Sequence, residues 1–313
     1  MKKLTMSGKL VFLFAAAALL VTGCIKQKIL IKVKPDGSGS ILVSAMYSKK
    51  MVDMFDKQME KQRARMEAQG MDSSAIDKGM QDPFFNEKEL KKQAAKFGEG
   101  VEYSKAKKVK NASGRGFMAL YTFKNIEDVK IDLKKMTNMM PQFGNQKPSD
   151  DDSVSFKLKK GKVAELTVNI PKQETPEVEE GSAEEEVSTE PTPLTDQDKA
   201  QMMANGNMFG LSGKEKTKEE VIRKMLGDMA ISVQVQVDGT VIKSNATHKD
   251  PKKKGRFTLF SVDYGVLLED DKVCSKMAKS EGGSNPMESL FAKENIKGIE
   301  IEKKPTVIVE FKK

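Results

Sequence analysis

The chain has 313 residues, of which 54 are Lys or Arg, 45 are Asp or Glu and two are Cys, and its formal net charge is +9 at pH 7. Both signs of charge are intermixed along the sequence, which excludes recognition of nucleic acid by charge alone. Two cysteines permit at most one intrachain disulfide, so stability has to come from a packed hydrophobic core, and the length allows one such core or two.

Residues 1–23 have the pattern of an export signal. Lys2, Lys3 and Lys9 precede an unbroken apolar run over 10–21. A run of this length forms about 18 Å of helix, whereas the hydrocarbon core of a bilayer is roughly 30 Å thick. The segment therefore predicts a signal peptide that is removed, and not a membrane span.

The end of this segment, Val21-Thr22-Gly23-Cys24, resembles the lipobox of bacterial lipoproteins. The resemblance implies signal cleavage between Gly23 and Cys24, a diacylglycerol on the Cys24 sulfur and an acyl group, such as palmitate, on its nitrogen. Two or more acyl chains attach a protein stably to a membrane, so the membrane is the first expected partner. Ile25 stands where Asp resembles an inner-membrane retention signal, which favours the outer membrane in a Gram-negative host and otherwise the outer side of the cytoplasmic membrane.

Residues 24–172 are predicted to form an N-terminal α+β region, with antiparallel sheet built from hairpins and amphipathic helices packed on one side. Hairpins are expected at 28–47 around Pro35-Asp36-Gly37-Ser38-Gly39, at 101–124 around Ser113-Gly114-Arg115-Gly116, and at 153–170 around Gly161-Lys162. Helices are expected at 49–69, at 87–97 after an Asn86 cap, and near 126–140.

The helix at 49–69 carries an apolar stripe opposite a face of mixed charge. The stripe consists of Met51, Val52, Phe55, Met59 and Met66. A helix lying on a membrane tends to a mostly basic polar face, so this pattern predicts packing on the protein's own sheet, with Phe55 and Met59 in the core. The preceding hairpin also needs a cover, because Leu30, Leu42 and Met46 point away from its other apolar face.

Residues 173–195 are rich in Glu and Pro and predict a disordered acidic linker, because they cannot bury enough apolar area to offset their ordering entropy. Residues 196–313 predict a C-terminal α+β region whose strands can share a sheet with the first. Its expected elements are a helix at 217–228, a hairpin at 231–247 turned at Asp238-Gly239, a strand at 256–262, helical pieces within 264–297 and a strand pair at 299–312.

Two stretches resemble uncharacterised bacterial surface lipoproteins related to the LppM-like lipoproteins. One is Cys24 with the strand that follows and the turn at 35–39. The other comprises 237–246, Phe257-Thr258-Leu259 and 307–311. The resemblance implies an α+β lipoprotein body and brings no catalytic motif with it.

Side chains suited to catalysis or metal binding are scarce. His248 is the single histidine and is expected in an exposed loop, and one histidine excludes a two-histidine metal site within a chain. Cys274 is expected to be a small buried apolar residue, with a reactive thiol as the alternative. The 20 methionines fit core filling or an adaptable binding surface, with soft Cu(I) ligands as the alternative. The run 252–254 predicts an exposed basic turn, or a contact with anionic lipid or wall polymer.

These features predict a membrane-anchored protein of the cell envelope that is not an enzyme and has a binding or structural role. Its partner would be an envelope protein or a cell-wall component, and we expect no nucleic acid, cofactor or metal. Two alternatives stay open: a carrier of a lipid or other apolar ligand, and an enzyme built on carboxylates or on Cys274. A large apolar cavity would favour the carrier, and a cleft with two facing carboxylates would favour the enzyme.

Overall fold

The computed structural model describes residues 25–69, 82–133, 153–171, 193, 217–279, 290–291 and 295–313. The predicted signal peptide, Cys24 and the predicted acidic linker at 173–195, apart from Pro193, lie outside the described residues. Pro193 forms an isolated bridge with Thr217, just before the first C-terminal helix.

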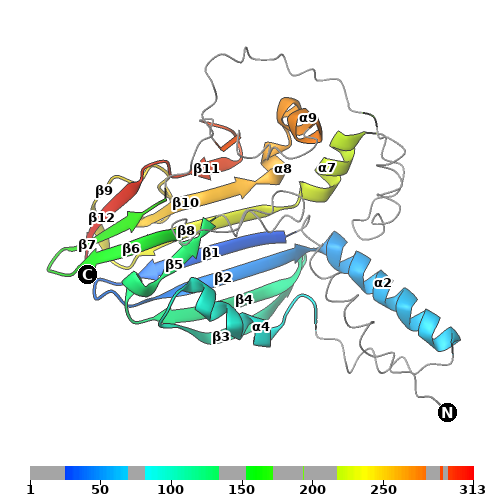
Figure 1. Ribbon diagram of the computed structural model, residues 1–313, viewed down its shortest axis with the longest axis horizontal. Helices are drawn as coiled ribbons and strands as arrows, with labels where there is room; N and C mark the ends of the chain where they lie inside the picture. Colours follow the sequence, from blue (N-terminus) through cyan, green and yellow to red (C-terminus); the bar gives the residue numbers. More distant parts are fainter. Residues whose placement is uncertain are drawn as a thin grey trace.

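Strands from both predicted regions contribute to two sheets (Figure 1). Sheet A has seven strands in the order β11-β10-β8-β1-β2-β4-β3, and sheet B has five in the order β5-β6-β7-β12-β9. The strands of sheet A are β1 Ile25–Val33, β2 Gly39–Ser48, β3 Val101–Asn111, β4 Gly114–Phe123, β8 Ala230–Val237, β10 Arg256–Asp263 and β11 Ile299–Ile301. Those of sheet B are β5 Lys130–Asp132, β6 Ser153–Lys159, β7 Ala164–Asn169, β9 Thr240–Ser244 and β12 Thr306–Lys312.

In the described part of the chain the helices are fewer than the strands, and only α2 is long. They are α2 Lys49–Ala68, α4 Glu87–Gln93, α7 Lys218–Leu226, α8 Tyr264–Leu267 and α9 Asp271–Lys279, with short 3₁₀ helices η1 Ala94–Phe97 and η2 Ile126–Asp128. The fold is thus α+β with antiparallel sheets, as predicted. Sheet A also contains one parallel pairing, which joins β1 to β8.

The three predicted N-terminal hairpins are present. In the first, Ile31 pairs with Ile41, and the turn is closed by the amide of Lys34, which donates to the carbonyl of Ser38 at 2.9 Å. Gly37 adopts a φ of +89°, a conformation that favours glycine. The second hairpin turns tightly between Asn111 and Gly114, earlier than predicted, so Gly116 lies within β4.

Two predicted strand pairs in the C-terminal region are wrong. β8 and β9 do not form a hairpin, because β8 belongs to sheet A and β9 pairs with β12 in sheet B. At Asp238-Gly239 the chain passes from one sheet to the other, and the amide of Asp238 donates to the carbonyl of Val33 at 2.7 Å. Likewise β11 pairs with β10 in sheet A, whereas β12 lies between β7 and β9 in sheet B. Alternation and turn chemistry predicted these strands correctly but did not determine their partners.

The helix predicted near 126–140 is also wrong over the part that the structure describes. Ile126 begins the single turn of η2, and Ile131 lies in the short strand β5, which pairs with β6. Ile126, Val129, Ile131 and Leu133 are all buried. Ile126 and Val129 are three residues apart, as on one face of a helix, whereas Val129, Ile131 and Leu133 are two residues apart, as on one face of a strand. The apolar pattern was therefore ambiguous. Residues 134–140 lie outside the described chain.

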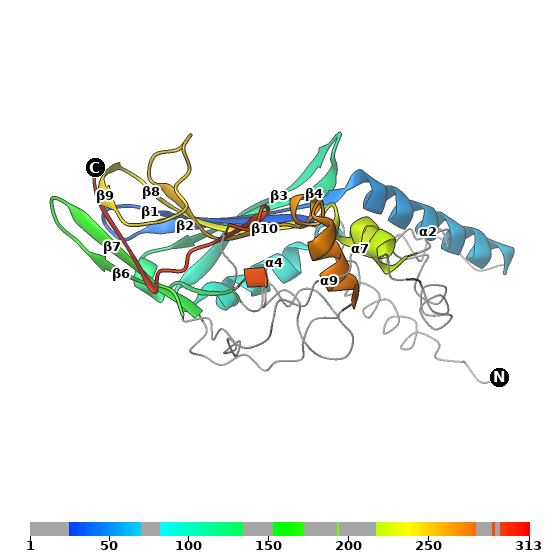
Figure 2. The same cartoon turned by 90° about the horizontal axis from the view of Figure 1, so that it is seen from above.

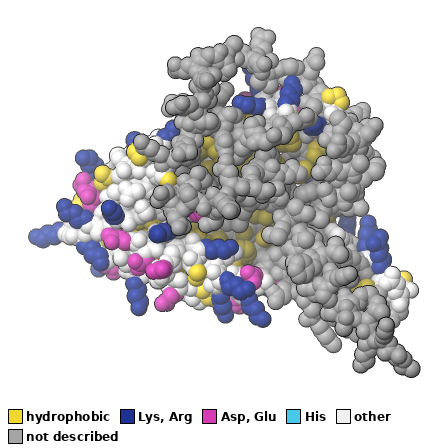
Figure 3. Space-filling view, viewed as in Figure 1, with side chains coloured by type: hydrophobic (Ala, Val, Ile, Leu, Met, Phe, Trp, Pro, Cys, Tyr) yellow, Lys and Arg dark blue, Asp and Glu magenta, His cyan; other side chains and the backbone are white. Residues whose placement is uncertain are grey.

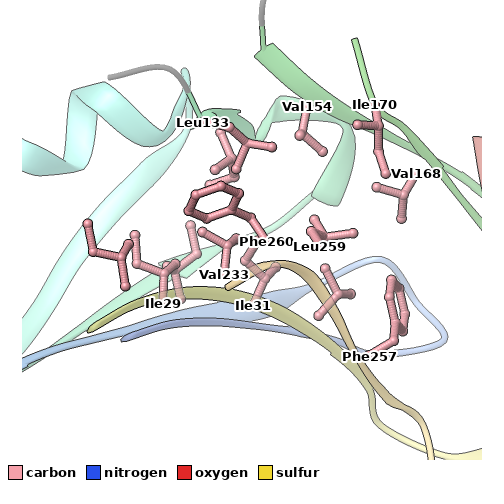
Figure 4. Close-up of a cluster of buried hydrophobic side chains, with 14 of the residues drawn as sticks. Ile29, Ile31, Leu133, Val154, Val168, Ile170, Val233, Phe257, Leu259 and Phe260 are labelled. Atoms are coloured by element: carbon pink, nitrogen blue, oxygen red, sulfur yellow. The ribbon is translucent and has the colours of Figure 1, made fainter. Parts of the chain in front are cut away.

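The core lies between one face of sheet A and the layer formed by sheet B with α4, α8 and α9. Figure 2 views sheet A nearly edge-on and shows α4, α9 and the β6–β7 hairpin on the same side of it. In Figure 4, Ile29, Ile31 and Val233 of sheet A point toward Leu133 and Val154 of the opposite layer. Every one of these side chains is buried. In β6 and β7 every second residue is buried in the same core, which explains the regular alternation of their sequences.

The buried residues of α2 lie in its first three turns. Met51, Val52 and Met59 are buried, and Asp56 forms a two-point ion pair with Arg115 of β4, with oxygen–nitrogen distances of 2.6 and 3.2 Å. Phe55 is half-buried, so its prediction as a core residue was wrong. Its ring lies edge-on against that of Phe84, and beyond it the helix extends past the end of sheet A in Figures 1 and 2.

Candidate functional site: the open face of sheet A

One face of sheet A is not covered by any described helix or by sheet B. Side chains alternate along a strand, so the residues between the core positions point to the opposite face. In Figure 2, α4, α9 and the β6–β7 hairpin of sheet B lie on one side of sheet A, while the tip of the β3–β4 hairpin and the loop before β10 rise on the other. We call this second side the open face. The expectation that α2 would cover it was wrong, because α2 leaves from the end of β2.

A row of leucines crosses the middle of the open face. Leu30 of β1 pairs with Leu42 of β2, which pairs with Leu120 of β4. Leu42 and Leu120 are half-buried, and Leu30 is only 5% exposed because it is surrounded by neighbours on both adjacent strands. Met46 and Met118, also half-buried, extend the apolar area. Cross-strand neighbours on one face lie in contact distance, so these residues form a continuous apolar stripe.

Basic residues surround this stripe. The register places six bases on the open face: Lys26, Lys28, Lys32, Lys105, Lys107 and Arg256. The same register places three acids there, all on outer strands: Glu102, Asp263 and Glu300. Asp263 is used to cap α8, where its carboxylate accepts from the amide of Val266 at 3.2 Å. The side of the molecule that Figure 3 shows, opposite the open face, instead carries Lys and Arg interspersed with Asp and Glu over sheet B.

A cationic cluster forms where the loop before β10 meets the open face. Arg256 donates to the Gln236 side-chain oxygen at 2.7 and 3.2 Å, and its Nη1 lies 3.7 Å from an Asp250 carboxylate oxygen. Burial lowers the pKa of Lys28, and the charges of Arg256 and Lys253 lower it further, while Asp250 acts in the opposite direction. The cations here therefore outnumber their local carboxylate. An anion bound near Lys28 would remove this unfavourable interaction.

Gln234 lies beside Leu30 in the same row and supplies an unused acceptor. Its side-chain nitrogen donates to the Thr258 hydroxyl at 3.4 Å, while its side-chain oxygen is buried and has no hydrogen-bond partner among the described residues. Buried polar atoms are almost always paired in folded proteins. Because the protein itself encloses this oxygen, a ligand on the open face does not reach it.

The loop before β10 is held in place by a buried carboxylate that the sequence did not reveal. Glu302, only 2% exposed, accepts from the amide of Thr247 at 2.6 Å and from its hydroxyl at 2.8 Å. His248 follows and is half-buried, with Nε2 3.1 Å from the carbonyl oxygen of Ile301. The histidine is therefore part of the loop's anchoring and not fully exposed as predicted. Lys252, Lys253 and Lys254 are exposed in the turn that follows, as predicted.

The other candidate residues lie away from the open face or outside the described chain. Cys274 is fully buried as predicted, with its sulfur 3.8 Å from the carbonyl oxygen of Glu219, and burial raises the pKa of its thiol. A nucleophilic cysteine needs a thiolate that its substrate can reach, and this thiol has neither property. Met51, Met59, Met229 and Met277 are buried, which fits core filling, whereas Met136, Met139, Met140, Met202, Met203 and Met208 lie outside the described residues. Within the described part of the chain, no group of three or more His, Cys, Asp or Glu side chains is placed to hold a metal ion.

No family model and no curated protein matches the chain. Among solved structures, the folded domain of LppM from Mycobacterium tuberculosis, determined by NMR, is similar with a TM-score of 0.28 and 9% sequence identity. The match covers 93% of this chain and 91% of that one. A TM-score of this size does not establish a common fold. None of the described helices is both long and apolar enough to cross a bilayer.

Proposed function

We propose that this chain is an exported, lipid-anchored protein of the bacterial cell envelope that acts by binding, with the open face of sheet A as its binding surface. The observation that carries the proposal is the open face itself. It combines an apolar stripe with a ring of bases. A sheet of seven strands with one face uncovered by described elements has area to bind a large partner.

The anchor rests on the sequence Val21-Thr22-Gly23-Cys24 after a basic segment and a short apolar run. Acylation of Cys24 would place the protein on the surface of a membrane, and Ile25 at the next position favours the outer membrane in a Gram-negative host. The absence of a described membrane-spanning helix is compatible with attachment by lipid. A Cys274-based enzyme is not supported, because the thiol is buried.

Metabolic labelling with a radioactive or clickable fatty acid tests the anchor directly. The parent chain should incorporate the label, and Cys24→Ala should lose it and accumulate as the longer, unprocessed precursor. Cys274→Ala is the matched control, since it removes the other cysteine and should keep both label and processing. Equal labelling of the parent and the Cys24→Ala variant would contradict the proposal.

A further inference from the structure

We infer that the occupant of the open face is the anionic phosphate layer of the membrane to which the protein is attached. This inference rests on the proposed function, because it takes the acylated Cys24 as the point of attachment. It identifies the membrane as the partner of the open face. Three observations support it: the position of β1 relative to Cys24, the excess of bases on the open face, and the kind of apolar residue found there.

The position of β1 brings the start of the open face close to the membrane. β1 begins at Ile25, directly after the attachment residue, and Lys26 is the first of its side chains on the open face. Strands rise about 3.3 Å per residue, so Lys26 lies about 7 Å along the chain from Cys24, and Lys28 about 13 Å. The headgroup layer on each side of a bilayer is about 5–8 Å thick. Lys26 is thus within reach of headgroup phosphates, and Lys28 lies directly beyond it.

The charge of the open face complements an anionic surface. Lys26, Lys28 and Lys32 form a line along β1, in the middle of sheet A, while the three acids lie on outer strands. Lys253 adds a cation near Lys28, whereas the Arg256 side chain is only 10% exposed and is paired with Asp250. Basic residues near an anionic leaflet each contribute favourably to association, and the lipid anchor raises their effective concentration there.

The apolar residues of the open face fit lipid better than they fit a protein partner. Protein interfaces obtain most of their binding energy from Tyr, Trp and Arg in desolvated pockets. The stripe instead consists of Leu30, Leu42 and Leu120 with two methionines, and Tyr103 and Tyr121 of the neighbouring strands pair with each other on the core side. The short leucine and methionine side chains of the stripe can contact the boundary between lipid headgroups and acyl chains. The ammonium groups of the bordering lysines can then bind the phosphates.

Vesicle binding tests the inference on the chain that begins at residue 24, with Cys24→Ser so that no acyl chain contributes. The described core starts at Ile29, so removal of the signal segment takes away none of its residues. We expect binding to phosphatidylcholine vesicles only when phosphatidylglycerol is added, and we expect rising ionic strength to weaken it. Each basic residue near an anionic surface contributes about a five-fold factor in affinity, so Lys26→Gln with Lys32→Gln should weaken binding about thirty-fold.

The matched control removes the same charge from the other side of the molecule. Lys157 and Lys159 are exposed on β6 of sheet B, and replacing both with Gln should leave vesicle binding within about two-fold of the parent. A second open-face pair, Lys105→Gln with Lys107→Gln on the edge strand β3, should weaken binding like the first. Equal binding to vesicles with and without phosphatidylglycerol would overturn the inference, as would equal losses in the sheet A and sheet B pairs. Because the Cys24→Ser variant used in this assay carries no lipid, either result is independent of whether Cys24 is acylated in the cell.

Discussion

Replacement of Glu302 with Gln tests how the loop beside the open face is held. The carboxylate accepts three hydrogen bonds: from the amide of Thr247 at 2.6 Å, from its hydroxyl at 2.8 Å and from the amide of Lys304 at 3.3 Å. The backbone amide of Glu302 also donates to the carbonyl of Leu259 at 2.9 Å, which fixes the main chain of Glu302 beside β10. Glutamine keeps the shape and one acceptor oxygen, but it turns an NH₂ group toward a donor.

The expected loss follows from that mismatch. A hydrogen bond to a charged group contributes about 1.5–3 kcal/mol, so losing one and weakening another should reduce the free energy of unfolding by about 2–4 kcal/mol. Urea denaturation, with unchanged dependence on urea concentration, measures this loss. Glu300→Gln is the matched control, because Glu300 is exposed two residues earlier and should change stability by less than about 0.5 kcal/mol.

A second measurement separates a local role from a general one. Thr247→Val removes the hydroxyl donor, and combined with Glu302→Gln it should cost less than the sum of the two single changes, because both act on one hydrogen-bonded pair. Hydrogen exchange at the Thr247 amide should also become faster in the Glu302→Gln variant. A loss below about 0.5 kcal/mol, or exact additivity of the two changes, would refute the assigned role of Glu302.

Two further predictions concern the core. Burial raises the pKa of Tyr121 to about 12, and its hydroxyl donates to the carbonyl of Leu90 at 3.0 Å. Because the unfolded chain ionises near pH 10, the contribution of Tyr121 to stability, about 2–3 kcal/mol, should be intact below that pH and lost toward pH 12. Tyr121→Phe should remove this part of the alkaline loss in pH-dependent denaturation, while the part due to Tyr264, whose pKa burial also raises, remains. An unchanged pH profile would contradict the prediction. Phe55→Ala should reduce the free energy of unfolding by only about 1–2 kcal/mol, because the ring is half-buried. Met51→Ala should reduce it by about 2–4 kcal/mol, because Met51 is 4% exposed. The reverse order of the two losses in chemical denaturation would show that α2 packs differently.

The sequence predicted those parts of the fold that neighbouring residues determine. The turn at Gly37 and the alternation of Ile31 and Ile41 act within one hairpin, so the hairpin could be recognised without the rest of the chain. The partners of β8 and β12 could not, because those pairings join segments far apart in sequence and depend on which sheet buries each strand. The sequence also predicted that α2 would pack against the apolar residues on the second face of sheet A, but α2 does not cover that face.

The candidate site was visible in part. Leu30, Leu42 and Met46 stood out as apolar residues opposite the core face of the first hairpin, but local pattern could not say whether an element covers them. The lysines of β1 and the bases Arg256 and Lys253 come together only through the parallel pairing of β1 with β8 and the antiparallel pairing of β8 with β10. The burial of Glu302 likewise depends on contacts between distant loops.

Photocrosslinking from the open face, in cells that make the full-length chain, tests the central claim most directly. A photoreactive amino acid at Leu42, in the apolar stripe, should form crosslinks that depend on light and on an intact Cys24. The same group at Thr167, which pairs with exposed Ile308 on the outer side of sheet B, should form few or none. The adducts at position 42 should carry membrane lipid. Equal crosslinking from positions 42 and 167, or none from position 42 while position 167 reacts, would contradict the claim that the open face is the binding surface.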